Sequence, residues 1–376
     1  MKLIRTSTVP ESLNSFCKDL LSELSQEGYE VIALSSPGDA LVEIERRESI
    51  RTIAVPMQRH ISPLKDIVSL LRLIKVFRKE KPDMVHSITP KAGLLSMMAA
   101  WICRVPVRLH TFTGLIFPTA TGLEQKILIF TDRITCACAT HIIPEGEGVK
   151  NDLINYRITK KPLKVLGFGN IKGIDLDKFN PELPEVRSAA AKIRKDGIFT
   201  FIFIGRLIRY KGINELVKAF VALHKEIPET RLVLVGKYEQ KLYPLCVETI
   251  NEINNNEAIE AVGQQSDVRP WLAVADVFVF PSYREGFPNV VIEAGAMGLP
   301  SIVTDINGSR EIIRKDQNGV IIPSKDAEAL LSAMKCFVEN PELVARLRKN
   351  ARKMVADRFE QSFVRQCLKD YYKEII

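Results

Sequence analysis

Residues 276–305 read DVFVFPSYREGFPNVVIEAGAMGLPSIVTD. The opening apolar run predicts a buried strand that ends near Pro281. A helix is expected to open at Pro288, because the missing N–H of proline costs least in the first helical turn. The later run PSIVTD predicts the next strand. Strand, helix and strand in this order are typical of a βαβ unit with parallel strands.

The same alternation extends over the whole chain. Apolar runs such as LIRTSTV, YEVIALS, MVHSI and VRLHTF alternate with helical patterns in the N-terminal half. The loop-like stretch GNIKGIDLDKFNP interrupts the alternation, which restarts at FTFIFIG. We therefore predict an α/β fold of two doubly wound, Rossmann-like domains that face a central cleft, with their boundary near residues 168–183.

The composition is that of an ordinary globular protein. The chain has 376 residues, 46% hydrophobic and 26% charged, which is enough for two sizeable cores. Its seven cysteines are odd in number and scattered, which favours a reducing cytoplasm. The N-terminus lacks a signal-peptide core, and the longest low-charge stretch, 92–103, is shorter than the ~20 residues of a spanning helix. We expect a cytoplasmic protein without a membrane span.

The formal net charge of +8 is concentrated in one segment. Residues 51–110 contain 11 Lys or Arg and 3 Asp or Glu. Such a local field suits phosphate groups, anionic lipid or nucleic acid. Nucleic acid is disfavoured as a partner, because no binding motif accompanies the charge.

Residues 65–80, KDIVSLLRLIKVFRKE, predict an amphipathic helix. The favoured interpretation is that its apolar face packs in the domain core and its basic residues remain at the surface. Together with residues 90–103 and 114–118, this basic surface suits a ligand that carries a diphosphate and a long lipid at the cytoplasmic face of the membrane. The apolar face consists of Ile67, Leu70, Leu71, Ile74 and Phe77.

The helix expected after Pro288 predicts an anion site, because the start of a helix presents N–H groups and a positive dipole end. Glu285 precedes this helix and Glu293 lies in its early turns. A phosphate repels a carboxylate, so we expect both glutamates to accept hydrogen bonds from sugar hydroxyls. The alternative is that Glu293 compensates the helix dipole and Glu285 is solvated.

Two cations upstream complement this site. Arg206 follows the strand FTFIFI, and Lys211 precedes a helix, where a cation is misplaced unless an anion binds there. Arg can grip a diphosphate with two parallel donors, and Lys supplies a point charge. The alternative is that both are solvated loop cations.

These motifs together resemble a known family. GRLIRYKG, VGQQSDV, the E-x7-E segment around Glu285 and Glu293, TDINGSREII and NGVIIP are similar to the donor-binding domain of the family 4 retaining glycosyltransferases of GT-B fold. DMVHSITPKAGLL, VPVRLHTFTG and GIDLDKFNP resemble the N-terminal domain and linker of its bacterial polysaccharide branch. The resemblance covers nearly the whole chain.

The resemblance implies the roles of the two domains. Residues 1–168 would form an N-terminal acceptor-binding Rossmann-like domain, and residues 169–357 a C-terminal domain that binds the nucleotide-sugar donor. The last helix, about 358–376, would pack back on the first domain. Such enzymes need no bound metal and no cofactor, because cations and a helix dipole stabilise the leaving nucleoside diphosphate.

The resemblance also implies roles for individual residues. Arg206 and Lys211 would bind the donor diphosphate, Glu285 the donor sugar and Glu293 the ribose hydroxyls. The remaining donor contacts would be the amides near Gly286, Phe287 and Asn289, with Val262 and Gly263 lining the base pocket.

The chain departs from the family pattern on the acceptor side. The loop TSTVPESLNSF has Ser12 and Asn14 where many members have a glycine pair. Thr113 stands where many members have a histidine, and His110 lies three residues earlier. Thr113 cannot act as a base at neutral pH, and His110 is either catalytic or a core histidine. Front-face attack needs little from a protein base, because the departing phosphate can take the acceptor proton.

We therefore expect a retaining glycosyltransferase at the inner face of a bacterial membrane. It would move a hexose or N-acetylhexosamine from a nucleotide diphosphate sugar, with UDP as the expected nucleotide, to a glycan or a polyprenyl-diphosphate-linked acceptor of capsule or polysaccharide synthesis. The alternatives are a nucleotide-sugar 2-epimerase and a non-catalytic sugar-nucleotide binding protein. A dinucleotide oxidoreductase is disfavoured, because no G-x-G-x-x-G follows the first strand.

Overall fold

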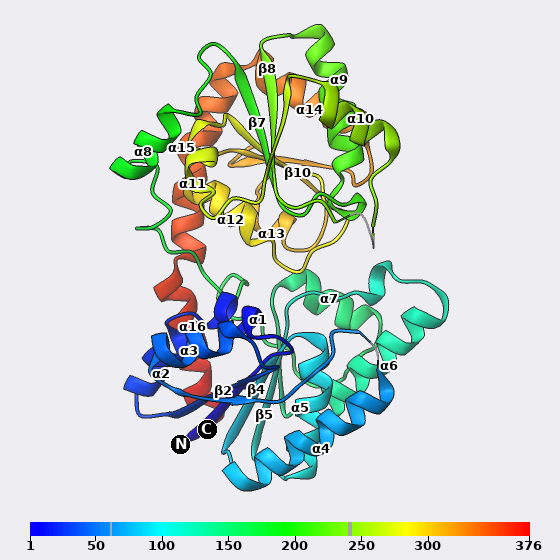
Figure 1. Cartoon of the computed structure of the whole chain (residues 1–376), viewed down its shortest axis with the longest axis vertical. Helices are drawn as coiled ribbons and strands as arrows, with labels where there is room; N and C mark the ends of the chain where they lie inside the picture. The colour runs from blue at the N-terminus through cyan, green and yellow to red at the C-terminus, as the bar shows by residue number, and fades with distance from the viewer. Residues whose placement is uncertain (61, 240–242) are drawn as a thin grey trace. The chain divides into compact units, whose positions relative to one another are not determined.

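The computed structural model describes residues 1–60, 62–239 and 243–376. The chain forms two compact units, which we call unit 1 (Met1–Lys172 with Ser362–Ile376) and unit 2 (Gly173–Gln361). Each unit contains one six-stranded sheet whose paired strands are all parallel. The expected α/β fold of two doubly wound domains is confirmed (Figure 1).

Unit 1 is built on the strand order β3-β2-β1-β4-β5-β6. Its elements before the boundary are β1 (Lys2–Thr6), α1 (Pro10–Cys17), α2 (Leu20–Gln26), β2 (Glu30–Ser35), α3 (Asp39–Glu48), β3 (Arg51–Ala54), α4 (Pro63–Glu80), β4 (Met84–Ile88), α5 (Pro90–Ile102), β5 (Val107–Phe112), the 3-10 turn η1 (Phe117–Thr119), α6 (Gly122–Cys138), β6 (His141–Pro144) and α7 (Glu147–Asn155). Helices α4, α5 and α6 lie side by side, with α5 in contact with both of the others (Figure 1).

Unit 2 has the order β12-β11-β10-β7-β8-β9. Its elements are α8 (Pro184–Ala191), β7 (Phe199–Ile204), the 3-10 turn η2 (Arg209–Lys211), α9 (Ile213–Glu226), β8 (Thr230–Val235), α10 (Val247–Asn255), β9 (Ile259–Gly263), α11 (Arg269–Val274), β10 (Val277–Phe280), α12 (Asn289–Ala296), β11 (Ser301–Thr304), α13 (Ser309–Ile312), β12 (Gly319–Ile322), α14 (Ala327–Glu339) and α15 (Pro341–Phe359).

The last helix, α16 (Gln361–Ile375), packs on unit 1. Tyr372 is fully buried, and its hydroxyl accepts a hydrogen bond of 2.7 Å from the buried Arg5 on β1. At the surface, the Lys369 ammonium lies 2.7 Å from Glu23 and 2.9 Å from Glu27 on and after α2. The chain therefore completes its first unit only with its last helix.

Both sheets have the same topology, in which the strand order reverses beside the first strand of each unit. The reversal lies between β1 and β4 in unit 1 and between β7 and β10 in unit 2. Crossovers leave to opposite faces of the sheet at such a switch point, and folds of this type commonly bind ligands beside the loops that follow these two strands. The candidate ligand sites are therefore the two loops at the switch point of each unit.

The apolar face of α4 does not lie where its sequence pattern predicts. The structure buries Ser69, Leu73 and Phe77. Ile67 and Leu71, both expected in the core, are 56% and 61% exposed. The expectation that the whole stripe is core is therefore wrong for these two residues, because the buried face of α4, which packs against α5, is centred on Leu73.

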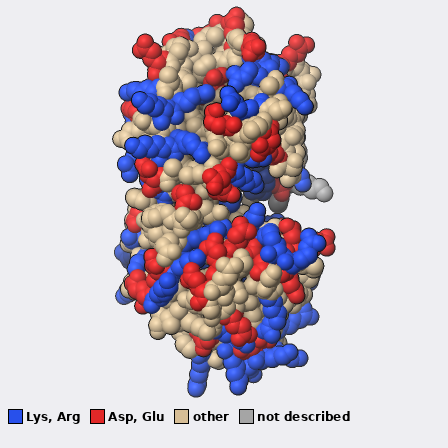
Figure 2. Space-filling view, turned by 90° about the vertical axis from the view of Figure 1, so that its left-hand side faces the viewer, with Lys and Arg blue, Asp and Glu red and all other residues tan. Residues whose placement is uncertain are grey.

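Basic side chains are exposed toward the end of α4 and beyond it. Arg72, Lys75, Arg78 and Lys79 all face solvent. Figure 2 shows lysine and arginine side chains gathered at the lower end of unit 1. The positive charge of residues 51–110 is thus displayed at the surface, as its density in the sequence predicts.

Candidate functional site

The candidate site of unit 2 lies at its switch point. One of its loops follows β7 and carries Arg206 and Lys211, and the other, residues 281–288, follows β10 and carries Glu285. Strands β7 and β10 are direct neighbours and parallel. Their carboxyl ends therefore bring together Lys211 and Glu285, which are 74 residues apart in the sequence.

The two loops are tied to each other through the backbone. The Tyr283 amide donates a hydrogen bond of 2.9 Å to the carbonyl of Tyr210. Gly212 has a φ of +72°, and a Cβ at this position would overlap the carbonyl of Pro281. Only glycine permits both this backbone conformation and this approach. The turn that presents Lys211 is therefore fixed against the loop that presents Glu285.

Lys211 and Glu285 form an ion pair at the centre of the site. Both side chains are less than one-fifth exposed. The hydroxyl of the fully buried Ser282 donates a hydrogen bond of 2.7 Å to the same carboxylate oxygen of Glu285. An ammonium group has three N–H donors, so Lys211 can bond Glu285 and a phosphate oxygen at the same time.

A third loop, which follows β11, contacts the backbone of the Glu285 loop. Thr304, at the end of β11, donates its hydroxyl to the carbonyl of Ser282. Gly308 has a φ of +71°, and a Cβ there would overlap the carbonyl of Gly286. The segment TDINGS thus packs directly against the backbone of residues 282–286, and its glycine is required for this contact.

Helix α12 begins at Asn289, one residue later than predicted, with Pro288 as its N-cap. Its first turn contains no acidic residue, so the positive end of the helix dipole is not compensated there by a carboxylate of the helix. Glu293 lies in the next turn and is half-buried. Phe287 is buried against Phe359, which holds the loop that leads into the helix.

The other donor-side candidates lie at the same edge of the sheet. Arg206 is 58% exposed and forms an ion pair of 2.6 Å with Glu239. Val262 and Gly263 end β9, which is two strands away from β7. The amide of Gly236 donates to the Gly263 carbonyl at 2.8 Å. The structure thus brings Lys211 and Glu285 together, and leaves Arg206, Val262 and Gly263 on the rim.

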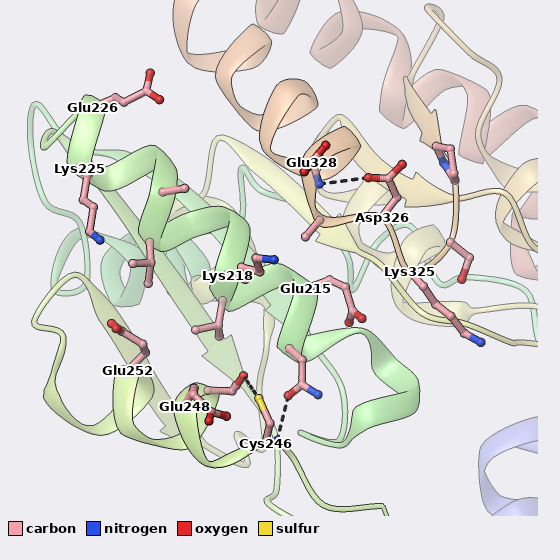
Figure 3. Close-up of a pocket in the computed structure, with 18 residues that line it drawn as sticks. Glu215, Lys218, Lys225, Glu226, Cys246, Glu248, Glu252, Lys325, Asp326 and Glu328 are labelled. Carbon is pink, nitrogen blue, oxygen red and sulfur yellow. Dashed lines mark hydrogen bonds between the residues drawn. The ribbon is translucent and has the colours of Figure 1, made fainter.

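A pocket of about 1180 Å³ in unit 2 is a separate feature. It lies between α9, α10 and the loop before α14 (Figure 3). Six carboxylate side chains and three lysines line it, so it repels a nucleoside diphosphate. Its link to the site is indirect: Glu215 on its wall accepts a hydrogen bond of 2.6 Å from the hydroxyl of Tyr283.

The acceptor-side candidates are on unit 1 and do not form one cluster. Ser12 lines a cavity of about 600 Å³ at the switch point of unit 1. Asn14 accepts a hydrogen bond of 2.6 Å from Arg47, so its side chain joins α1 to α3. Thr113 follows β5 and is half-buried.

His110 lies inside unit 1 and is 1% exposed. Its Nδ1 is 2.8 Å from the hydroxyl of Ser87 on the neighbouring strand. Burial lowers the pKa of His110 to about 3, so the ring is neutral at physiological pH. A Cβ at Gly93 of α5 would overlap the ring. This environment favours the alternative of a core histidine that fills the space beside a helix glycine.

Metal ligands do not cluster in the described residues 1–60, 62–239 and 243–376, where no group of three or more His, Cys, Asp or Glu side chains is placed to hold a metal ion. No helix in this part of the chain combines the length and the hydropathy needed to span a bilayer.

Both halves of the chain match known protein families. The family "Glycosyl transferase 4-like domain" matches residues 13–169, and "Glycosyl transferases group 1" matches residues 187–354. The chain belongs to the GT-B glycosyltransferases.

The glycosyltransferase is similar to bacterial relatives over nearly its full length. It is 29% identical to the capsular polysaccharide biosynthesis glycosyltransferase CapM of Staphylococcus aureus, over 100% of this chain and 97% of the relative. It is 28% identical to the UDP-Gal:alpha-D-GlcNAc-diphosphoundecaprenol alpha-1,3-galactosyltransferase of Escherichia coli, over 88% and 85% of the two chains. The crystal structure of Anabaena Alr3699/HepE in complex with UDP shares the fold, with a TM-score of 0.81, 17% identity and full coverage of both chains.

Sequence reasoning missed the residues that hold the site of this glycosyltransferase in place. Four small residues at or near the ends of elements contact the Glu285 loop or its partner loop: Ser282, Thr304, Gly212 and Gly308. A signal was present for Ser282, which follows a buried strand three residues before Glu285. Nothing in the sequence links Thr304 to Ser282, because that contact depends on the order of the strands.

Proposed function

We propose that this glycosyltransferase transfers a hexose or an N-acetylhexosamine from a UDP-linked donor, with retention of configuration, to a polyprenyl-diphosphate-linked or growing polysaccharide acceptor. Unit 2 binds the donor and unit 1 binds the acceptor. The protein works at the inner face of the cell membrane as a peripheral enzyme. The relative from Escherichia coli, whose name specifies a UDP-sugar donor and a diphosphoundecaprenol acceptor, supports this choice of substrates.

The single observation that carries the proposal is the Lys211–Glu285 pair at the switch point of unit 2. The ammonium group of Lys211, paired with the loop that leads into α12, favours a diphosphate, and the N-terminus of that helix adds N–H donors. The carboxylate of Glu285, oriented by Ser282, accepts hydrogen bonds from neutral hydroxyls and so favours a sugar directly next to that diphosphate. A nucleoside diphosphate sugar has both groups in this order.

Each donor-side residue has a distinct role in this proposal. Lys211 and Arg206 bind the diphosphate, Glu285 the donor sugar, and Glu293 the ribose hydroxyls. Amides near Gly286, Phe287 and Asn289 bind phosphate or sugar oxygens. Val262 and Gly263 line the base.

The reaction proceeds by front-face attack. The bond between the anomeric carbon and the phosphate oxygen breaks, and its electron pair leaves with UDP. The acceptor hydroxyl forms the new bond on the same face, and its proton passes to the departing phosphate oxygen. Lys211, Arg206 and the start of α12 stabilise the developing negative charge, which is the main contribution that such a site makes to the rate.

Attachment to the membrane rests on unit 1. The exposed basic residues of α4 attract anionic lipid, and each contributes about 1 kcal/mol near such a surface. Exposed apolar residues on the same helix, among them Leu64 at 81% exposure, add contact with the interface.

Donor hydrolysis tests the proposal without an acceptor. Purified protein is incubated with a panel of UDP-, GDP-, ADP- and dTDP-sugars, and the release of nucleoside diphosphate is measured beside the Glu285→Ala variant. We expect slow release from one UDP-hexose or UDP-N-acetylhexosamine, and loss of that release in the variant. Proton NMR of the product formed with an acceptor then shows the anomeric configuration. Preference for another nucleotide, or an inverted product, would contradict the proposal.

A further inference from the structure

Unit 1 has its own cavity at its own switch point. The cavity measures about 600 Å³ and begins at Thr8 and Thr89, which follow β1 and β4. The two hydroxyls lie 2.8 Å apart, and the Thr8 amide donates to Thr89 at 3.0 Å. Thr89 has a φ of +74°, an uncommon conformation for a β-branched residue. The two loops are thus joined in unit 1, as the loops around Lys211 are in unit 2.

The end of the cavity next to the sheet is polar and carries cations. Lys91, in the first turn of α5, forms an ion pair of 2.5 Å with Asp66 of α4. The exposed Arg59 also lines the cavity, together with the carboxylates of Asp66, which is paired with Lys91, and Glu124 on α6. Lys91 lies in the first turn of α5, where the N–H groups of the helix start add positive charge. The N-terminus of α5, Lys91 and Arg59 therefore suit an anionic group.

Apolar side chains line the cavity as well. They are Leu94 on α5, Ile116 before η1, and Ile127 and Leu128 on α6, which also contributes Glu124 and Thr131 to the lining. Leu94 and Met98 are only half-buried, and Trp101 at the end of the same helix is 58% exposed. These residues follow one face of α5, which is about 20 Å long at 1.5 Å per residue.

This face of α5 is unusual, because the helix is apolar on all sides. The only charged residue of α5 is Lys91 in its first turn. A helix of this composition is normally buried all round. Here α4 and α6 flank it, and they too expose large apolar side chains toward solvent: Leu64, Ile67, Val68 and Leu71 on α4, and Leu123, Ile127 and Phe130 on α6.

We propose that the groove formed by α4, α5 and α6 binds the isoprenoid units next to the diphosphate of a polyprenyl-diphosphate acceptor, while Arg59 and Lys91 bind that diphosphate. The inference rests on the proposed function, and it assigns an acceptor subsite within unit 1. An anion-binding end that leads into an apolar channel matches a ligand whose diphosphate is bonded directly to a hydrocarbon chain. The sugar end of the acceptor then lies at the switch point, beside Thr8, Thr89 and Ser12.

The first experiment measures binding without catalysis. Trp271→Phe leaves Trp101 as the only tryptophan of the two in the chain. In this background, farnesyl diphosphate serves as the probe, with inorganic diphosphate and farnesol as the two halves of the ligand. We expect a blue shift of Trp101 emission that saturates with farnesyl diphosphate at a Kd at least tenfold lower than with either half. Equal affinity for farnesyl diphosphate and farnesol, or no saturable shift, would overturn the inference.

The second experiment uses a matched pair of variants. Ile127→Asn places an amide in the apolar wall, and Ile154→Asn makes the same change at an exposed position of α7 outside the cavity. With a polyprenyl-diphosphate-linked sugar as acceptor, we expect Ile127→Asn to raise KM about tenfold or more and Ile154→Asn to leave it unchanged. With the same sugar acceptor lacking the lipid, both variants should match the parent.

The outcomes separate the subsite from the function. If the parent enzyme transfers sugar to the lipid-linked acceptor but the two variants have equal KM values, the groove is not the lipid subsite and the proposed function stands. If no lipid-linked acceptor is used at all, the proposed function fails, and the fluorescence titration still reports whether the groove binds a lipid diphosphate. Lys91→Gln provides a further check, because it should weaken farnesyl diphosphate and leave farnesol unaffected.

Discussion

The two units share one strand order but present different surfaces at their switch points. In unit 2 the two loops bring together the ammonium group of Lys211 and the carboxylate of Glu285, which lies in the loop that leads into α12. In unit 1 they join through the hydroxyls of Thr8 and Thr89 and open toward apolar helices. Of the 18 large hydrophobic side chains exposed in the described residues, 16 belong to unit 1, and Tyr238 and Val247 are those of unit 2.

This difference shows how one sheet topology can carry two unlike candidate sites. Both candidate sites lie where the strand order reverses, the usual place for a ligand in such folds. The residues in the loops and on the covering helices differ between the units. The charged loops of unit 2 suit the donor that we propose, and the apolar helices of unit 1 suit the proposed lipid-linked acceptor.

The largest expected effect concerns the basic surface of unit 1. Replacing Arg72, Lys75, Arg78 and Lys79 together by glutamine should weaken binding to anionic vesicles by about 4 kcal/mol, or ~10³-fold, at about 1 kcal/mol per residue. All four are exposed on or near the end of α4. Vesicle cosedimentation measures the loss, and turnover on a short soluble acceptor should hardly change.

A matched control tests whether this attachment is local to unit 1. Neutralising the exposed Lys192, Arg346, Lys349 and Lys353 of unit 2 changes the net charge by the same amount. We expect this control to retain most of the binding, which should also fall steeply with salt, since the Debye length is ~8 Å at physiological ionic strength. Equal losses in both variants would mean that overall charge, and not unit 1, attracts the membrane.

The next largest effect is expected at Glu285, the carboxylate at the switch point of unit 2. Glu285→Ala should lower turnover by ~10² to 10³-fold, the usual loss when one group that stabilises a transition state is removed. UDP affinity should stay the same or rise, because Lys211 is no longer paired with the carboxylate of Glu285. Steady-state kinetics and calorimetry with UDP measure the two quantities. Glu293→Ala should instead weaken UDP binding. If Glu285→Ala lost as much UDP affinity as Glu293→Ala, the roles assigned to the two glutamates would be wrong.

A smaller effect separates the two cations. Lys211→Ala should weaken the binding of UDP by about 1.5 to 3 kcal/mol, the contribution of a hydrogen bond to a charged group. Arg206→Ala should lose less, because Arg206 is largely exposed and already paired with Glu239. Calorimetry with UDP measures the affinity of both variants. Unchanged affinity in both variants would remove the diphosphate from this switch point.

The smallest effect concerns the core of unit 1. His110 has its pKa lowered to about 3 by burial, whereas an unfolded histidine titrates near 6.5. Only the unfolded state gains a proton between these values, so stability is fully present above pH ~6.5 and declines as the pH falls toward 3. From pH 7.5 to 5.5 this should cost about 1.4 kcal/mol of unfolding free energy. His110→Asn should remove that part of the decline in urea titrations.

The same variant tests the catalytic alternative. A core histidine predicts that His110→Asn lowers activity far less than the ~10² to 10⁴-fold expected for a lost general base. A loss in that range, in protein that keeps its UDP affinity, would show that the buried ring takes part in the reaction after all.

The sequence by itself determined the class of fold and the main features of the donor side. Alternating apolar runs and helical patterns predicted two parallel sheets, because a parallel sheet requires a crossover helix between strands. The spacing from Glu285 to Glu293, with Lys211 before a helix, predicted an anion site with carboxylates nearby. These inferences succeed because they depend on local order along the chain, where strand ends and helix starts can be recognised.

The tertiary structure alone decided which surfaces meet. The pattern of α4 indicated an apolar face but not what covers it, and α5 leaves Ile67 and Leu71 uncovered. Thr8 and Thr89 are 81 residues apart and meet only because β1 and β4 are neighbours. Thr304 reaches Ser282 for the same reason. Hydrophobic periodicity indicates which face of each element is apolar. Which neighbour covers that face depends on the order of the strands in the sheet. Crossovers of similar length can produce more than one such order.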